Sequence, residues 1–135
     1  MYNGRCLCSS VQFEIHGPIR NIIYCHCSEC RKAQGSAFAT NGIADVNEFK
    51  IVKGDDQLSS YANSATQTKY FCRNCGSPIM SKNTKRPNQV RVRLGTIESD
   101  IKESPEAHIF VSSKANWDSI HDDLPQFDTL EPNRD

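Results

Sequence analysis

Alternation of apolar and polar residues is the main pattern along the chain, and it predicts short β-strands. The clearest case is Ser10–Ile15, in which Val11, Phe13 and Ile15 alternate with polar residues. Further segments are rich in β-branched or aromatic residues and have the length of strands: Ile19–Tyr24, Ala37–Ile43, Phe49–Val52, Thr66–Phe71, Gln89–Leu94 and His108–Val111. Turn residues separate these segments at short intervals, so we expect a mainly β fold with a sheet or barrel-like layout.

One segment has the features of a short helix. Ser28–Gln34 begins with a residue type that often caps a helix, carries Arg31 and Lys32 near its end, and is followed by Gly35. We expect about two helical turns here. Ser28 is the predicted N-cap, and Gly35 is the predicted stop.

Residues 1–130 are predicted to form a single domain, because no linker, low-complexity tract or internal repeat divides them. Beyond Pro105, the large side chains of Trp117, Phe127 and Leu130 stand among acidic residues. We expect these side chains to pack their segment against the body of the domain. Residues 131–135 are predicted to be a frayed C-terminal tail.

Composition narrows the possible classes of protein. Hydrophobic residues make up 37% of the chain, and adding the seven glycines still leaves the fraction below the roughly 45–50% of ordinary domains, which predicts a thin core. Sixteen Lys and Arg residues balance sixteen Asp and Glu residues, which argues against a nucleic-acid partner. The basic cluster Lys82, Lys85, Arg86, Arg91 and Arg93 is interpreted as a solvated turn and strand face.

The chain also lacks the patterns of membrane and secreted proteins. No apolar run approaches the roughly 18 residues of a membrane span, so no membrane partner is expected. The first residues do not have the pattern of a signal peptide. We therefore expect a cytoplasmic location, in which thiols stay reduced.

Seven cysteines carry the candidate chemistry, and they fall into three groups: Cys6 and Cys8; Cys25, Cys27 and Cys30; Cys72 and Cys75. The last pair has the Cys-x-x-Cys spacing that presents two sulfurs to one zinc ion. Cys6 and Cys8 can supply two more, because residues i and i+2 of an extended chain point to the same side. Cys6, Cys8, Cys72 and Cys75 are therefore predicted to close a structural zinc site.

The remaining cysteines, Cys25, Cys27 and Cys30, offer only three sulfurs. Catalytic zinc sites typically use three protein ligands and leave the fourth position to water or substrate, so we predict a catalytic zinc here. Three thiolates favour a soft fourth ligand, which makes a small thiol the expected substrate. Bound in this position, the thiol would be held as the nucleophilic thiolate.

A second closed site is the main alternative, with a fourth ligand from His26, His108 or His121. His26 is the weakest of these candidates, because an extended chain directs it away from Cys25 and Cys27. Its alternative role is a surface imidazole or one that supports the ligands. Gln34–Phe38 follows the cysteine triplet and either lines the open site, with Ser36 as a donor, or is a plain turn into a strand.

The order of these motifs resembles the glutathione-dependent formaldehyde-activating family, which includes relatives of centromere protein V. The matching motifs are Gly4-x-Cys6-x-Cys8, Cys25-His26-Cys27-x-x-Cys30-Arg31, Phe71-Cys72-x-x-Cys75-Gly76, Gly95-Thr96-Ile97 and Pro105-Glu106-Ala107-His108-Ile109. The resemblance implies a small tent-like fold of layered antiparallel sheets, stabilised by zinc. It also implies two zinc ions per chain, with the same division into structural and catalytic ligands.

The activity implied by this resemblance is that of a carbon–sulfur lyase that joins glutathione to formaldehyde and gives S-hydroxymethylglutathione. The sequence departs from the usual family pattern at Ser9–Ser10 and at Ile97–Glu98, neither of which is a predicted metal ligand. These departures leave the substrate open. The alternative function is a non-catalytic module that binds another protein and uses zinc only to hold a thin core together.

Overall fold

The computed structural model describes residues 1–132 and residue 134. Within this part of the chain, a three-stranded sheet has the order β1-β2-β5, and a seven-stranded sheet has the order β10-β3-β4-β9-β8-β7-β6. The strands are β1 (Tyr2–Arg5), β2 (Gln12–Ile15), β3 (Arg20–Cys25), β4 (Ala39–Asp45), β5 (Phe49–Lys53), β6 (Leu58–Ala62), β7 (Gln67–Cys72), β8 (Pro78–Asn83), β9 (Gln89–Arg93) and β10 (Ala107–Ile109). The α-helix is α1 (Ser28–Gln34), and short 3₁₀ helices span Asp55–Gln57, Leu94–Thr96 and Val111–Ser113.

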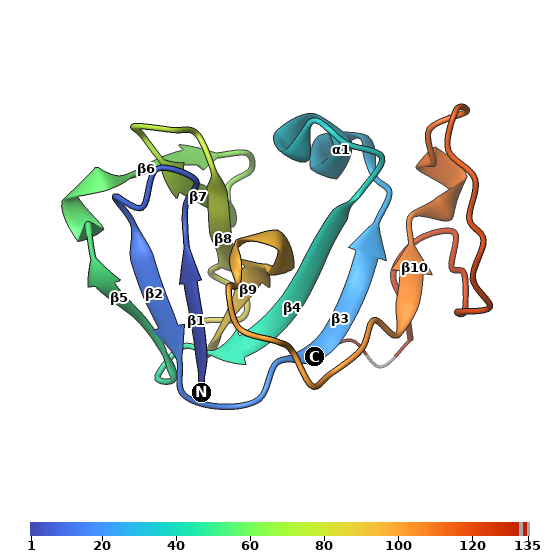
Figure 1. Ribbon diagram of the computed structural model, residues 1–135. Coiled ribbons are helices and arrows are strands. Elements are labelled where there is room, and N and C mark those ends of the chain that lie inside the picture. The colour runs from blue at the N-terminus through green and yellow to red at the C-terminus, as the bar shows by residue number, and fades with distance from the viewer. Residues whose placement is uncertain (133, 135) are drawn as a thin grey trace.

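The predicted mainly β class with one short helix is confirmed. In Figure 1 the small sheet stands beside the large one, and α1 lies between the end of β3 and the start of β4. All strand pairs are antiparallel except β10 with β3, which is parallel. This parallel pair places His108 beside Tyr24 and Ile109 beside Cys25, so a late segment of the chain lies against the cysteine triplet.

Three strands were not predicted, namely β1, β6 and β8. Gly4 lies within β1, and its lack of a side chain makes room for a ring, since an added Cβ would lie 2.0 Å from Cζ of Phe13. Phe13 is the partner of Gly4 in the β1–β2 ladder, so the aromatic ring covers the glycine. β8 starts at Pro78, a residue that is tolerated at the first position of a strand.

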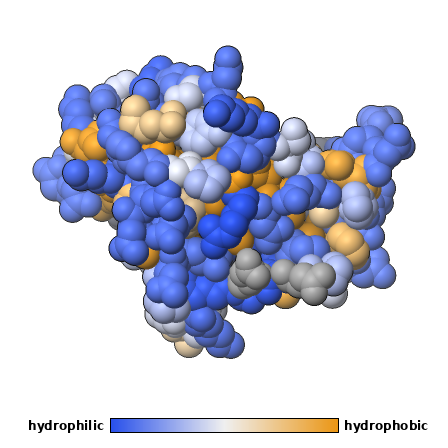
Figure 2. Space-filling view, turned by 90° about the horizontal axis from the view of Figure 1, so that it is seen from below, coloured by the Kyte–Doolittle hydropathy of each residue, from blue (hydrophilic) through white to orange (hydrophobic). Residues whose placement is uncertain are grey.

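The main core lies between the two sheets. Its buried side chains come from the small sheet, as with Phe13 and Ile15, and from the large sheet, as with Ile79 and Val92. A second, smaller cluster contains Cys25 and Cys30 together with Ile23, Ala39, Ala107 and Ile109. The cysteine triplet is therefore anchored in a hydrophobic cluster. The surface seen from below is mostly hydrophilic, with hydrophobic residues showing in separate areas (Figure 2).

Helix α1 has the predicted length and stop but a different N-cap. Gly35 ends the helix in the left-handed conformation, with φ of 62°, as predicted. The prediction of Ser28 as N-cap is wrong. Cys27 is the cap, and its sulfur accepts the backbone N–H of Cys30 at 3.3 Å. A thiol thus takes the place of the usual hydroxyl or carboxylate oxygen.

In the segment after β10, fewer of the large side chains pack against the body of the domain than predicted. Phe127 packs against the second cluster, but Trp117 is 70% exposed and Leu130 is 48% exposed. Backbone hydrogen bonds hold the segment instead, because His108 donates to Pro125 and Phe127 donates to His108. The frayed tail predicted for residues 131–135 includes 133 and 135, which lie outside the described residues, and it stays a prediction.

Among the residues described, no helix has both the length and the apolar character that crossing a membrane requires.

Candidate metal centres

The first cysteine group joins the two sheets. Cys6 and Cys8 follow β1, Cys72 ends β7 and Cys75 lies in the turn before β8; the four sulfurs lie within 4.8 Å of one another. The Sγ atoms of Cys6 and Cys8 are 3.6 Å apart, and those of Cys8 and Cys72 are 3.8 Å apart. Sulfurs at about 2.3 Å from a tetrahedral zinc ion lie roughly 3.8 Å from one another, so this donor set fits zinc.

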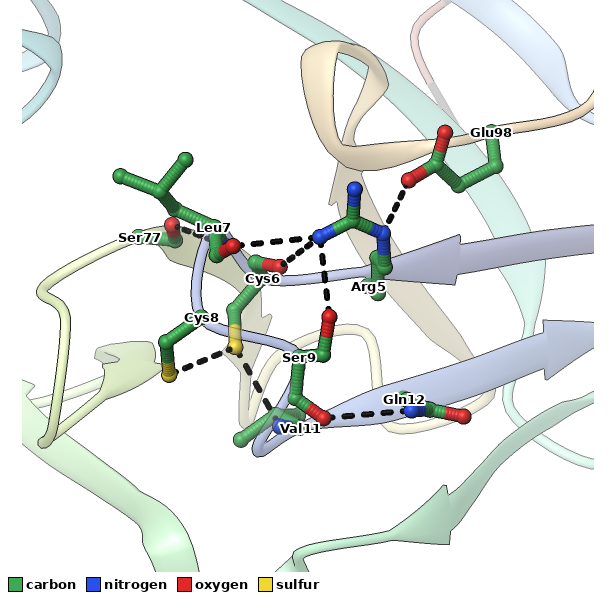
Figure 3. A network of polar contacts seen from close by, with 9 residues as sticks. All are labelled: Arg5, Cys6, Leu7, Cys8, Ser9, Val11, Gln12, Ser77 and Glu98. Atoms are coloured by element: carbon green, nitrogen blue, oxygen red, sulfur yellow. Dashed lines mark hydrogen bonds and ion pairs between the residues drawn. The ribbon is translucent and has the colours of Figure 1, made fainter.

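Arg5 organises the loop that carries Cys6 and Cys8 (Figure 3). Its Nη1 donates to the carbonyl oxygens of Cys6 and Leu7, each at 3.1 Å, and to Oγ of Ser9 at 3.0 Å. Its Nε pairs with Glu98. Ser9 has φ of 69°, a conformation that these contacts help to hold.

The second loop of this group is a tight turn between β7 and β8. Gly76 has φ of 81°, a conformation that glycine adopts at no steric cost, and its N–H donates to the carbonyl of Cys72 at 2.7 Å. Leu7 N–H donates to Ser77 Oγ at 2.9 Å, which ties this turn to the Cys6–Cys8 loop. Hydrogen bonds within and between the two loops therefore hold the cysteines in place.

The second group consists of Cys25, Cys27 and Cys30, whose sulfurs lie within 4.8 Å of one another. Cys25 ends β3, Cys27 caps α1 and Cys30 lies in its first turn. Cys25 and Cys30 are buried, whereas Cys27 is half-buried. In the described part of the chain, no His, Asp or Glu joins this group, so it offers three donors.

The protonation of these thiols also suits a cation. Hydrogen bonds from the thiols of Cys25 and Cys30 lower the pKa of Cys27 to about 2. The pKa of Cys25 is raised by its hydrogen bonds to Cys27 and Cys30 and by burial. A sulfur that ionises next to two thiols provides the negative charge that a metal ion requires.

His26 and His108 bind each other rather than the sulfurs. Nε2 of His26 lies 2.8 Å from Nδ1 of His108, and Nε2 of His108 lies 2.9 Å from Oδ2 of Asp122. When His108 is neutral and donates its Nε2–H to the carboxylate, its Nδ1 accepts from His26 Nε2–H. His26 is fully buried, so the alternative of a surface imidazole is wrong. Burial is the main cause that lowers the pKa of His26.

This chain of hydrogen bonds could not be predicted from spacing. Asp122 gave no signal, and His108 reaches His26 only because β10 pairs with β3 in parallel. His121, the remaining candidate for a fourth ligand, is exposed.

A cavity of about 270 Å³ lies against the cysteine triplet, and all three cysteines line it. Gln34–Phe38 does not line this cavity, and Ser36 is exposed, so the interpretation as a turn is the correct one for this segment. The interpretation of the basic cluster as a solvated face holds for Lys82 and Lys85, which are exposed, and is wrong for Arg93 and for the terminal nitrogens of Arg91, which are shielded from solvent. Lys82, Arg86 and Arg91 line the cavity, and Arg93 is buried at 4% exposure.

A comparison with known proteins shows to which family the chain belongs. The family described as glutathione-dependent formaldehyde-activating enzyme matches residues 1–113. The chain belongs to this glutathione-dependent formaldehyde-activating family. The resemblance found in the cysteine motifs is thereby confirmed, since the match spans all three cysteine groups.

The relatives of the chain in this family are distant. A putative glutathione-dependent formaldehyde-activating enzyme of Podospora anserina is 31% identical over 78 residues, which is 56% of this chain and 36% of the relative. An uncharacterized lyase of Schizosaccharomyces pombe is 26% identical over 87 residues, which is 64% of this chain and 61% of the relative. The chain thus spans between about a third and three fifths of the length of these curated relatives.

A solved structure has a similar fold. The crystal structure of a Rhodobacter sphaeroides protein superposes with a TM-score of 0.63 at 25% identity. The similarity covers 76% of this chain and 97% of that chain.

Proposed function

We propose that the protein is a zinc-dependent enzyme of the carbon–sulfur lyase type that joins a small thiol, such as glutathione, to formaldehyde. The observation that carries this proposal is the convergence of three sulfurs on the wall of a cavity, with no fourth protein donor among the described residues. Catalytic zinc sites have this open arrangement, and closed structural sites do not. Membership of the formaldehyde-activating family supports the same reaction.

The two cysteine groups have different roles in this proposal. Cys6, Cys8, Cys72 and Cys75 would hold a structural zinc, and Cys25, Cys27 and Cys30 would hold a catalytic one. When bound by the triplet, zinc supplies a Lewis acid that lowers the pKa of a thiol at its fourth position. All seven cysteines are free thiols in the structure, which suits a reducing compartment such as the cytoplasm.

The cavity residues position and stabilise the reacting groups. The substrate sulfur attacks the carbonyl carbon of formaldehyde, and a carbon–sulfur bond forms. The carbonyl electron pair moves to oxygen, which takes up the proton that the thiol gave up. Lys69 lines the cavity and its charge acts on Cys30, so it is placed to stabilise negative charge that develops on this oxygen.

Native mass spectrometry with and without glutathione tests the proposal. We expect two zinc ions per chain and a glutathione adduct in the wild type. Cys27→Ser should keep one zinc and lose the adduct. The product is then sought by NMR with ¹³C-formaldehyde and glutathione. Two zinc ions without any adduct or product would instead favour the non-catalytic protein-binding module.

A further inference from the structure

The cavity beside the cysteine triplet has an excess of positive charge. Among the described lining residues, Glu29 is the one carboxylate, and five side chains are cationic: Lys69, Lys82, Arg86, Arg91 and Arg134. Such a wall attracts an anion into a confined space, where charge interactions are stronger than in water.

Arg91 differs from the other cations of the cavity in the state of its two terminal nitrogens. Its terminal nitrogens Nη1 and Nη2 are shielded from solvent and have no hydrogen-bond partner among the described residues. A buried guanidinium without partners is costly, so such groups are usually paired. Burial lowers the pKa of Arg91 to about 10, and repulsion from Arg134 adds to this effect.

Neighbouring side chains that the structure describes do not accept hydrogen bonds from the terminal nitrogens of Arg91. The Glu131 carboxylate acts on Arg91 through space, but its hydrogen bonds go to Arg134. On the same strand, Nη1 of Arg93 is paired within the chain, because it donates to Ser81 Oγ at 3.4 Å and to the Arg91 carbonyl at 3.2 Å. Within residues 1–132 and 134, the two terminal nitrogens of Arg91 therefore stay unpaired, on a side chain that lines the cavity.

We propose that Arg91 is the anion-binding residue of this cavity and holds a carboxylate of the thiol substrate while the substrate sulfur lies at Cys25, Cys27 and Cys30. The inference rests on the proposed function and adds a specificity-determining residue to it. A planar guanidinium with two free nitrogens matches a carboxylate in a bidentate pair.

Asn41 indicates a second chemical group that the ligand should carry. It is 5% exposed and lines the same cavity, and its Oδ1 has no hydrogen-bond partner within the described part of the chain. This oxygen can only accept a hydrogen bond, so it suits an N–H group of the ligand. The substrate class is thus an acidic thiol with an amide or amine N–H.

Calorimetric titration of the zinc-loaded protein with matched thiols tests the role of Arg91. N-acetylcysteine and N-acetylcysteinamide have the same thiol and differ in one carboxylate. We expect the wild type to bind the acid about tenfold to a hundredfold more tightly, as for a charge-assisted pair. Arg91→Gln should remove this preference, and Arg91→Lys should keep part of it. Arg20→Gln, an equal change of charge at an exposed position of β3, should leave it unchanged.

N-acetyl-S-methylcysteine separates this inference from the proposed function. This probe keeps the carboxylate and lacks the thiol, so weaker binding reports on the cysteine triplet alone. If the S-methyl compound binds as tightly as N-acetylcysteine while the acid is still preferred over the amide, the thiol role is contradicted and the anion role stands. Equal binding of acid and amide to the wild type, or no binding of either, overturns the role of Arg91. A preference that survives in folded Arg91→Gln also overturns it.

Discussion

Cys27 combines two roles at the scale of a single residue. Its sulfur belongs to the triplet that is proposed to bind metal, and the same atom accepts the Cys30 N–H in the first turn of α1. A ligand atom that also caps a helix links metal binding to the local backbone. Loss of the metal and loss of the cap can be separated, because serine is a good N-cap but a poor zinc ligand.

Two substitutions at this position should therefore differ in stability. Cys27→Ser and Cys27→Ala are both expected to lose the second zinc. Only the alanine variant loses the cap as well, so it should be less stable than the serine variant by about 1 kcal/mol. Urea denaturation of both proteins, with zinc content measured in parallel, gives the comparison. Equal free energies of unfolding would show that the sulfur contributes nothing as a cap.

A second prediction at the scale of a single residue concerns the contribution of Glu103 to stability and its dependence on pH. Its burial opposes ionisation, but hydrogen bonds from the Tyr2 hydroxyl and the Ile19 N–H outweigh this effect, and the pKa of Glu103 lies below its ordinary value. A carboxyl with a lowered pKa stabilises the fold above its unfolded-state pKa, near 4.3, and this contribution disappears as the pH falls through the folded-state value.

Glu103→Gln should therefore be less stable than the wild type at pH 7, with a difference that shrinks below about pH 4. Urea midpoints measured between pH 3.5 and 7 test this. Any loss of zinc in acid affects both proteins, so only the difference between them is interpreted. A difference that stays constant over this range would exclude ionisation of Glu103 as its cause.

At the scale of the elements, sequence patterns predicted the strands with clear alternation but not those shaped by neighbours. The sequence of β2 alternates clearly between apolar and polar residues, whereas β1 contains Gly4 and pairs with β2 where the Phe13 ring lies beside this glycine. The cysteine groups were predictable because metal chemistry restricts both residue type and spacing. The burial of the Arg91 nitrogens could not be predicted from the sequence. A basic residue on a strand has the same sequence pattern whether it faces water or a cavity.

The pairing of β10 with β3 gives a prediction for these elements. Asp122 accepts from His108 on β10, and this hydrogen bond lowers the pKa of Asp122. Asp122→Asn should weaken the link between the late segment and β3, so the amides of Ala107–Ile109 are expected to exchange faster. Hydrogen exchange followed by mass spectrometry measures this. Asp123→Asn, a change at a neighbouring exposed residue, is the control.

At the scale of the whole molecule, the four-cysteine group joins the small sheet to the large one. Its ligands come from the ends of β1 and β7, which are far apart in the sequence. A metal ion at this position would close a long loop and hold both sides of the main core together. The triplet, by contrast, lies within one segment from the end of β3 to α1.

Removal of metal should therefore proceed in two stages. Under increasing chelator, the zinc of the open triplet is expected to leave first, with little change in far-ultraviolet circular dichroism. The zinc of the closed group should leave later and with loss of the fold, because a closed thiolate site contributes on the order of 10 kcal/mol to folding. Zinc release followed with a colorimetric indicator, together with circular dichroism, tests the order. Simultaneous release with collapse of the fold would contradict it.

The residues that line the cavity come both from the segment that matches the family and from the segment after it. The family match ends at residue 113, and the cysteine triplet lies within it, yet Leu130 and Arg134 also line the cavity. The cysteine triplet and part of its surroundings are thus encoded by different stretches of the gene. If the proposed function is correct, mutations in the late stretch would change which thiol is accepted without altering any of the proposed metal ligands.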